Sequence, residues 1–315
     1  MPKGNQGKKR KIQSKLLKQY LDFLREHQCL SESTINTRRN FISPFLSKID
    51  GITSPSKLYR LSPKTIHDYI IKNSRSLSRA NKKHLTSSLR SFLRFAHIYG
   101  HLKKSLSEVV PVIAARKLER IPKKISWNDV KKLLSAPDRK IPIGRRDYAI
   151  LLLLATYGVR IGQVRNLKLT DIRWHEGTIN FSASKGGNPL SFPLEACIAK
   201  ALLEYIIEYI KKDRKEAPFK EVFLTVRRPP KPFSNKNVLQ SSFKLYYKRA
   251  KIVSEARSAH AIRHAFATRL MEKRVPIKTI ADLLGHRWIG TTFIYTKVDI
   301  VRLRLLARKW PEVII

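Results

Sequence analysis

Acidic side chains are scarce in this sequence. Its 315 residues include 23 Asp and Glu against 65 Lys and Arg, so the formal net charge at pH 7 is +42. So many like charges repel one another within a folded chain, and a polyanionic partner relieves that repulsion. Nucleic acid fits best, because neutralising its phosphates also releases condensed counterions. The alternatives are a basic protein that is merely soluble and one that binds an acidic membrane surface.

Cysteine and long apolar runs are also scarce. Only Cys29 and Cys197 occur, far apart and outside any metal-binding spacing, which argues against a disulfide scaffold and a zinc site. The longest apolar stretch, residues 148–159, contains Thr156 and Gly158 and is too short to cross a membrane. The basic start of the chain has no apolar run behind it of the kind that a secretory signal needs. We therefore expect a cytoplasmic, nucleoid-associated protein without membrane contact.

The remaining composition is that of a globular protein, with 42% apolar residues, and the length allows two domains. After a basic tail over residues 1–10, residues 11–112 carry apolar side chains at three- and four-residue steps, which predicts a bundle of four helices. Ser31 or Ser33 can cap the second helix, and Ser62 followed by proline can start the third. Polar, basic residues then predominate over 113–124, which we interpret as an interdomain linker.

Basic residues gather on the outer face of the fourth expected helix and in the linker. They are Lys82, Lys83, Arg90 and Arg94 in the helix, and Arg116 and Lys117 in the linker. We expect these side chains to bind DNA phosphates, which position a protein on the duplex without reading its sequence. The alternative is a solvated helix face, where most surface lysines lie.

Residues 125–315 predict a second domain that is mainly helical. Ser126 can cap its first helix, and residues 146–159 predict a largely buried one. A β pattern covers three short segments, residues 171–174, 177–182 and 190–194. Helical patterns then resume, and an amphipathic tail begins at about residue 297. The expected fold class is therefore mainly α with a small antiparallel β-sheet.

His260 and Arg263 lie three residues apart, so on a helix both side chains point to the same spot. Such a pair is common and by itself indicates only a surface contact. Further along, an apolar helix end is followed by Gly285 and His286, and Tyr295 comes nine residues after His286. A lone tyrosine in an apolar run is usually a core residue. This one follows a His-Arg-His series in a strongly basic chain, which favours a role in chemistry on DNA.

Because of these residues and their spacing, the sequence resembles the tyrosine recombinases, the phage-integrase family. The resemblance lies in two conserved stretches of that family, called signature boxes. The first box is ATYGVRIGQVRNLKLTDI over residues 155–172, which includes Arg160. The second combines HAIRHAFATRL over 260–270, IADLLGH over 280–286 and TTFIY over 291–295. Between the boxes, Lys185 occupies the place of the family's hairpin lysine. The first domain resembles the family's SAM-like core-binding domain, so the similarity covers nearly all of residues 11–310.

The resemblance implies a site-specific DNA recombinase or integrase with a catalytic domain of the DNA breaking-rejoining type. Tyr295 is expected to attack a DNA phosphodiester and to form a 3′-phosphotyrosyl link, while a 5′ hydroxyl departs. Arg160 and Arg263 are expected to bind the phosphate oxygens by bidentate hydrogen bonds, and His286 to add a further hydrogen bond. Lys185 is expected to act as the general acid, and His260 to accept the tyrosine proton. Neither a metal ion nor ATP nor another cofactor is expected, because the phosphoester survives in the intermediate.

The family also implies self-association. In the tail after Tyr295, apolar residues alternate with Arg302, Arg304, Arg308 and Lys309. The resemblance implies that such a tail docks on a neighbouring protomer, which would give a tetramer on two double-stranded DNA sites. Packing within its own domain is the alternative.

Three places depart from the family's pattern. Gln163 stands where Glu is usual, and an amide can keep the hydrogen bonds of that Glu without its charge. Pro189 and Leu190 stand where basic residues are often found, and Arg274 stands where a glycine often ends the helix. None of these changes removes an expected catalytic group.

Two other functions fit parts of this pattern. A type IB topoisomerase uses similar chemistry but relaxes one duplex as a monomer, and the tail and the position of His260 argue against it. A non-catalytic DNA-binding protein would need none of the catalytic groups, and the presence of all six argues against that function.

Overall fold

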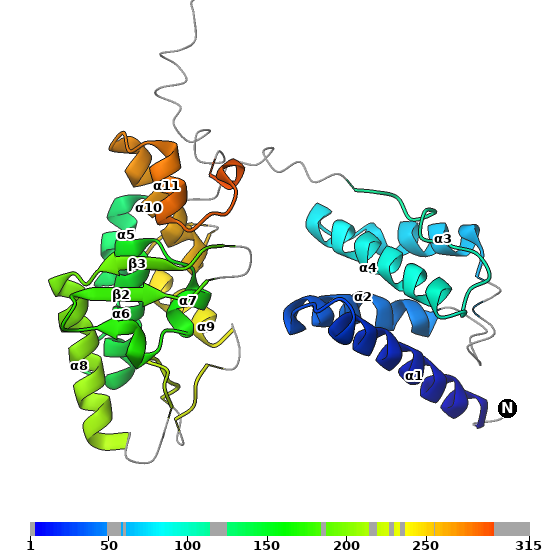
Figure 1. The fold of residues 1–315 in the computed structure, drawn as a ribbon, viewed down its shortest axis with the longest axis horizontal. Helices are drawn as coiled ribbons and strands as arrows, with labels where there is room; N and C mark the ends of the chain where they lie inside the picture. The colour runs from blue at the N-terminus through cyan, green and yellow to red at the C-terminus, as the bar shows by residue number, and fades with distance from the viewer. Residues whose placement is uncertain are drawn as a thin grey trace, which may run out of the picture. The chain divides into compact units, whose positions relative to one another are not determined.

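A computed structural model describes residues 4–48, 58, 61–113, 125–183, 187–213, 219–226, 230–233, 237–254 and 256–292. The chain divides into two compact units, an N-terminal unit over Met1–Lys117 and a C-terminal unit over Leu118–Ile315 (Figure 1). The division falls between Lys117 and Leu118, and residues 114–124 of the expected linker lie outside the described residues.

The described part of the N-terminal unit is a helical bundle (Figure 1). Its helices are α1 (Gly4–Glu26), α2 (Glu32–Lys48), α3 (Pro63–Ser74) and α4 (Arg79–Ile98). Local chemistry starts them as predicted: the Thr34 amide donates to Ser31 Oγ at 3.4 Å, and the Ser62 side chain accepts from the Thr65 amide ahead of α3. Gly100, with φ +70°, follows the end of α4.

Aromatic side chains fill the core of the N-terminal unit. Tyr20 of α1 meets Phe92 of α4 edge to face with ring centroids 5.3 Å apart, and Phe45 of α2 lies against Phe92 at 6.1 Å. All three side chains are fully buried, as the apolar spacing predicts. Because α1, α2 and α4 each contribute to this cluster, the outer face of α4 is held in a defined place.

The N-terminal segment differs from the prediction. Residues 1–10 were expected to be a basic tail, whereas α1 begins at Gly4. Lysine, arginine and glutamine are good helix formers, and no proline interrupts the run from Gly4 to the apolar part of α1. The basic residues of this segment therefore continue the helix that enters the core.

The described part of the C-terminal unit surrounds one buried helix, α6 (Pro142–Tyr157). Every residue of α6 from Ala149 to Ala155 is buried, and the helix packs against α5, α8 and α10. The other α-helices of this part are α5 (Trp127–Leu134), α7 (Ile161–Arg165), α8 (Ala196–Asp213), α9 (Asn237–Arg249), α10 (Ala259–Glu272) and α11 (Ile277–Leu283). Short 3-10 helices lie at η2 (Leu169–Asp171) and η4 (Ile289–Thr291).

A three-stranded antiparallel sheet in the order β1-β2-β3 lies in the same unit (Figure 1). Its strands are β1 (Ile172–Arg173), β2 (Thr178–Phe181) and β3 (Leu190–Pro193), and Phe181 pairs with Leu190 in register. The Tyr157 hydroxyl donates to the Pro193 carbonyl at 2.7 Å, which ties the sheet to the end of α6. The predicted fold class, mainly α with a small antiparallel sheet, is confirmed.

A buried ion pair in α6 was not predicted. Arg146 and Asp147 are each 3% exposed, and Arg146 Nη2 lies 2.7 Å from Asp147 Oδ1. Arg146 Nη1 also donates to the Leu224 carbonyl at 3.1 Å, and the Tyr246 hydroxyl of α9 donates to Asp147 Oδ2 at 2.9 Å. The pair therefore links α6 to α9 and to the segment around Leu224.

Within the part of the chain that the structure describes, no helix combines the length and the apolar character that crossing a membrane requires.

Candidate active site

The turn after α6 builds the first part of the site. α6 ends at Gly158, whose φ of +61° is a left-handed conformation that favours glycine. A Cβ at this position would lie 2.3 Å from the ring of Phe266, so a side chain has no room there. Two residues later, Arg160 stands at the N-terminus of α7. The glycine thus allows the chain to turn sharply and to present Arg160 next to α10.

Arg263 of α10 meets that turn. It is 2% exposed, and its guanidinium donates to the Gly158 carbonyl at 2.8 Å and to the Leu284 carbonyl at 2.7 Å. Arg160 donates to the same Leu284 carbonyl at 3.5 Å. Leu284 caps the C-terminus of α11, where the carbonyl ends of a helix carry partial negative charge. That charge offsets part of the repulsion between two guanidinium groups that come from distant parts of the unit's sequence.

His286 completes this cluster. Gly285, with φ +59°, ends the turn after α11, and His286 Nε2 then lies 2.9 Å from a guanidinium nitrogen of Arg263. A guanidinium has only donors, so Nε2 accepts, and the proton of the imidazole sits on Nδ1, 2.8 Å from Thr292 Oγ1. Burial, helped by the positive charges of Arg263 and Arg160, lowers the pKa of His286 to about 4. The imidazole is therefore neutral at physiological pH.

Two further histidines on α10 are neutral for similar reasons. Burial, with the charges of Arg263 and Arg160, lowers the pKa of His260. Burial lowers the pKa of His264 to about 4, and its ring packs edge to face against that of His260 with centroids 4.8 Å apart. No role was predicted for His264 from the sequence, although it stands one residue after Arg263 in the same signature box.

Gln163 of α7 keeps two hydrogen bonds, in line with the expectation for an amide at this position. Its Oε1 accepts from the backbone N–H of Arg160 at 3.0 Å, and its Nε2 donates to the Ser182 carbonyl at 3.0 Å. Arg274, where a glycine often stands, has φ +62° just after α10. A non-glycine residue in this conformation carries local strain.

The structure brings four of the six expected catalytic residues together: Arg160, His260, Arg263 and His286. Lys185 and Tyr295 lie outside the described residues. Their described neighbours are at the site nonetheless. Gly187, two residues after the lysine, forms an antiparallel bridge with His286, and Thr292, three residues before the tyrosine, contacts the His286 ring.

A mainly apolar cavity of about 480 Å³ opens beside this cluster. Arg160 and His260 lie on its wall, and Val159, Leu239 and Phe243 supply apolar surface. Two of the expected catalytic side chains therefore border open space that a substrate can reach. Among the residues that the structure describes, no three His, Cys, Asp or Glu side chains are grouped so that they could hold a metal ion.

The expected DNA-binding residues of α4 differ in their surroundings. Lys83 and Arg94 are exposed and Lys82 is half-buried, whereas Arg90 donates to the Val110 carbonyl at 2.8 Å. Arg90 thus holds the segment that leads toward the linker. Arg116 and Lys117 of the expected set lie outside the described residues.

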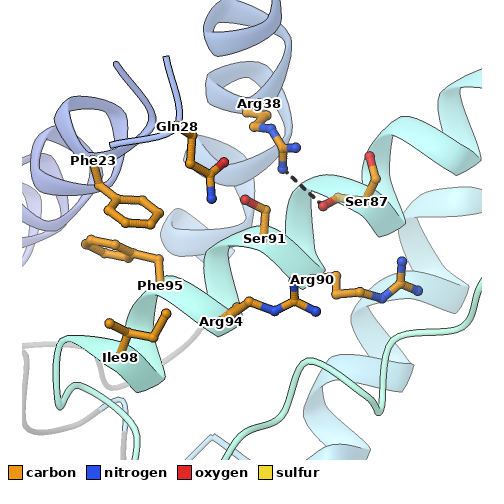
Figure 2. A pocket seen from close by; sticks show the side chains of 9 residues that line it. All are labelled: Phe23, Gln28, Arg38, Ser87, Arg90, Ser91, Arg94, Phe95 and Ile98. Atoms are coloured by element: carbon orange, nitrogen blue, oxygen red, sulfur yellow. Dashed lines mark hydrogen bonds between the residues drawn. The ribbon is translucent and has the colours of Figure 1, made fainter. Parts of the chain in front are cut away.

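Arg38 of α2 is a basic residue beside the expected DNA-binding residues of α4, and its sequence position did not predict this neighbourhood. With Arg90, Arg94 and Ser91, it lines a pocket of about 210 Å³, and the rings of Phe23 and Phe95 line the same pocket (Figure 2). Arg38 Nη1 donates to the Ser87 carbonyl at 3.2 Å, which holds the guanidinium against α4. The adjacent basic pair Arg38-Arg39 on the polar side of α2 was the available signal.

Known proteins are similar to this chain in sequence and in fold. Residues 123–301 match the profile of the phage integrase family. A protein of Sinorhizobium fredii named as an integrase/recombinase, y4rA, is 36% identical over 292 residues, which cover 93% of this chain and 70% of that protein. The tyrosine recombinase XerD of Listeria monocytogenes is 28% identical over 294 residues, covering 92% and 96% of the two chains.

The fold is also that of a solved structure, the lambda integrase tetramer bound to a Holliday junction. The TM-score is 0.65 with 18% sequence identity, and the match covers 95% of this chain and 79% of the lambda integrase chain.

Proposed function

The chain belongs to the phage integrase family, and on this premise we propose that six of its residues form one active site that cuts and rejoins DNA: Arg160, Lys185, His260, Arg263, His286 and Tyr295. As a tyrosine recombinase, the protein acts on double-stranded DNA through a 3′-phosphotyrosyl intermediate. Each of these residues is proposed to perform a separate part of the reaction, and the protein is proposed to assemble as an oligomer on its DNA substrate.

The observation that carries the proposal is the convergence of Arg160 and Arg263 on the Leu284 carbonyl, with a neutral His286 beside them. A carbonyl dipole offsets only part of two positive charges, and a phosphate anion supplies the rest. Breaking a phosphodiester depends above all on neutralising its charge, because that charge repels the nucleophile and grows in the transition state. The cluster suits that task.

Arg263 contributes fewer contacts to the phosphate than a free guanidinium would. A guanidinium has five N–H groups, and those of Arg263 already serve Gly158, Leu284 and His286. At most two remain for DNA. The bidentate clamp is therefore assigned chiefly to Arg160, with Arg263 as the buried charge that stabilises the bound anion.

His286 takes up a proton when the phosphate binds. In the free site its Nε2 accepts from Arg263, so it cannot donate to a phosphate oxygen in that state. Burial and then the charges of Arg263 and Arg160 lower the pKa of His286 in the free site, and a bound phosphate neutralises those two charges. Protonated Nε2 then donates to a non-bridging oxygen. This refines the sequence-based expectation of a simple hydrogen bond.

The cleavage step conserves the phosphoester. The hydroxyl oxygen of Tyr295 bonds to phosphorus as the bond from phosphorus to the 5′ oxygen breaks. The tyrosine proton passes to His260, which is neutral because its pKa is lowered, and Lys185 protonates the departing 5′ oxygen. Reversal with a new 5′ hydroxyl rejoins the strand, so no ATP is consumed.

On the N-terminal unit, Lys82, Lys83 and Arg94 are proposed to bind DNA phosphates, together with Arg116 and Lys117. Their positive charge and the exposure of Lys83 and Arg94 support this assignment. With DNA as its substrate, the protein is proposed to be cytoplasmic and nucleoid-associated.

The active form is proposed to be a tetramer on two DNA sites. A protein of the same fold, lambda integrase, has been solved as a tetramer on a Holliday junction, which is the kind of four-way DNA that joins two duplexes. The amphipathic tail from about residue 297 is the segment proposed to link neighbouring protomers.

Trapping the covalent intermediate tests the nucleophile. The substrates are overlapping duplexes from the DNA that flanks the gene, each nicked so that the released 5′-hydroxyl fragment diffuses away. We expect the full-length protein to form a denaturant-resistant adduct that keeps a 5′-end label, and Tyr295→Phe to form none. Tyr99→Phe is the matched control, because Tyr99 is 47% exposed on the N-terminal unit. An undiminished adduct with Tyr295→Phe, or none with the unmodified protein, would refute the assignment.

A further inference from the structure

We infer that Thr292 is a positioning residue for His286: its hydroxyl oxygen accepts the Nδ1 proton of the imidazole, so that Nε2 faces Arg263 and the bound phosphate. The inference rests on the proposed function, in which His286 takes up a proton and donates to a phosphate oxygen. It assigns a role to a residue of the second signature box that is not one of the six expected catalytic residues.

The turn after His286 brings Thr292 back to the imidazole. That turn contains η4, and the backbone N–H of Thr292 donates to the Ile289 carbonyl at 2.7 Å. Thr292 is completely buried (0% exposed), whereas its neighbour Thr291 is exposed. The inner threonine contacts the ring, with its Oγ1 2.8 Å from Nδ1 of His286. Two adjacent residues of the same type therefore have opposite surroundings.

Arg263 decides which ring nitrogen carries the proton. Nε2 of His286 lies 2.9 Å from a guanidinium nitrogen of Arg263, and a guanidinium has donors only. The one proton of the neutral imidazole is therefore on Nδ1, which needs an acceptor. A hydroxyl oxygen has two lone pairs and can supply one, so Thr292 satisfies Nδ1 while Nε2 accepts from Arg263. Rotation of the ring would break both hydrogen bonds.

The hydroxyl of Thr292 stabilises the ring most when the ring is charged. Both nitrogens of an imidazolium carry a proton, so Nε2 can donate to the phosphate while Nδ1 still donates to Thr292. Hydrogen bonds to a charged group are roughly twice as strong as those between neutral groups. Thr292 therefore stabilises protonated His286 more than neutral His286, and the protonated form is the one proposed to bind the phosphate.

The other groups around the ring oppose its protonation in the free site. Burial lowers the pKa of His286 most, followed by four neighbours from α10 and from the start of α7: Arg263, Arg160, His260 and His264. A bound phosphate neutralises the two arginine charges, as proposed above. The threonine hydroxyl is uncharged and does not titrate, so its stabilising contribution to the protonated ring is present at every pH.

Replacing the hydroxyl tests the inference. Valine keeps the branched shape of threonine without its hydroxyl, so Thr292→Val leaves the Nδ1 proton without its acceptor. Thr291→Val is the matched control, because it makes the same change at the exposed neighbour. The rate of covalent adduct formation is measured on the nicked duplex at saturating protein, so that DNA affinity does not enter. We expect a loss of about 10- to 100-fold at neutral pH in Thr292→Val, the value of a hydrogen bond to a charged group.

Thr291→Val should keep the rate of the unmodified protein, and Thr292→Ser, which retains a hydroxyl, should restore most of it. Equal rates in Thr292→Val and Thr291→Val would overturn the inference, and so would a Thr292→Ser variant as slow as Thr292→Val.

The pH dependence separates this role from a merely structural one. The measured quantity is the rate of Thr292→Val divided by that of the unmodified protein at each pH. Without the hydrogen bond the pKa of His286 in the complex is lower, so the variant needs a lower pH to protonate the ring. The ratio should therefore rise toward one as the pH falls from about 8 to about 6. Titration of His260 is common to both proteins and cancels. A ratio that stays constant or falls would contradict the inference, because misfolded protein is lost at every pH alike.

His286→Ala distinguishes failure of the inference from failure of the proposed function. If His286→Ala does not slow adduct formation, the proposed role of His286 is wrong and the inference falls with it. If His286→Ala slows the reaction and Thr292→Val does not, His286 acts without Thr292, and only the inference is wrong. When both residues act together, adding Thr292→Val to His286→Ala lowers the rate no further. A full additional loss in the double variant would show that Thr292 acts on another group.

Discussion

Asp147→Leu should lower the free energy of unfolding of the C-terminal unit by about 3–5 kcal/mol. Asp147 and Arg146 are each 3% exposed and 2.7 Å apart, so removing the carboxylate leaves a buried guanidinium without its charge partner. The variant also removes the acceptor of the Tyr246 hydroxyl, which donates to it at 2.9 Å. Leucine is larger than aspartate, so the variant opens no cavity, and crowding adds to the cost of the uncompensated charge.

Urea denaturation followed by tryptophan fluorescence measures this loss. All four tryptophans, Trp127, Trp174, Trp288 and Trp310, belong to the C-terminal unit, so the signal reports that unit alone. With a urea dependence of about 2 kcal/mol per molar, a loss of 3–5 kcal/mol moves the midpoint down by about 2 M. Glu176→Leu is the matched control, because it breaks an ion pair with Arg173 that is exposed on both sides and costs at most about 1 kcal/mol.

A second variant tests the reasoning itself. Arg146→Met combined with Asp147→Leu removes both charges, and replacement of a buried ion pair by apolar side chains is often neutral. The double variant should therefore be more stable than Asp147→Leu alone. A loss under about 1 kcal/mol in Asp147→Leu, or a double variant whose cost is the sum of the two single costs, would show that the charge pair is not buried as described.

Two further predictions concern the active site. Gly158→Ala should destabilise the C-terminal unit by more than Gly177→Ala in the same urea assay. Both glycines have φ +61°, but only at Gly158 would an added Cβ meet another residue, 2.3 Å from the Phe266 ring. Equal losses in the two variants would contradict this steric argument. The thermal midpoint should fall as the pH drops from about 6.5 toward 4, because His264 and His286 take up protons near pH 6.5 when unfolded and only near a pKa of about 4 when folded. A midpoint that stays constant over this interval in thermal scans at successive pH values would contradict the depressed pKa values.

Local signals in the sequence predicted much of the fold. Ser62 and Ser126 cap helices as expected, because a serine hydroxyl satisfies the free N–H groups of the next turn whatever the rest of the chain does. The β segments and the buried helix α6 also follow from local patterns of apolar residues, and their order is that of the structure. At the N-terminus, the run of basic residues suggests a tail, whereas α1 includes it because lysine, arginine and glutamine are good helix formers.

Sequence motifs also indicated the candidate site, and the structure placed four of its residues together. The spacing of His260 and Arg263 is a property of one helix, so it could be read from the chain. The convergence of Arg160 and Arg263 on Leu284 could not be derived from spacing, since these residues are far apart in the sequence and meet only when α7, α10 and α11 pack.

The tertiary structure alone decided what each charged or polar group contacts. Arg146 and Asp147 are two charged residues in a helix that the sequence predicts to be largely buried, and the packing of α9 and the Leu224 segment supplies the partners of both. Arg90 was expected to bind DNA, and its guanidinium also donates to the Val110 carbonyl, a contact that the sequence does not predict. A hydrogen bond to a backbone carbonyl depends on where that carbonyl lies in space and not on the type of residue that carries it. No sequence motif therefore predicts such a bond.

Charge, composition and motifs by themselves determined that this chain is a two-domain, DNA-directed enzyme of the tyrosine recombinase family. These properties depend on residue types and on short spacings, which the sequence states directly. Only the tertiary structure decided that His286 is neutral in the free site, that Arg263 has few donors left, and that Gln163 joins two segments. Each of those depends on distances between groups remote in the chain, and such distances exist only once the helices have packed.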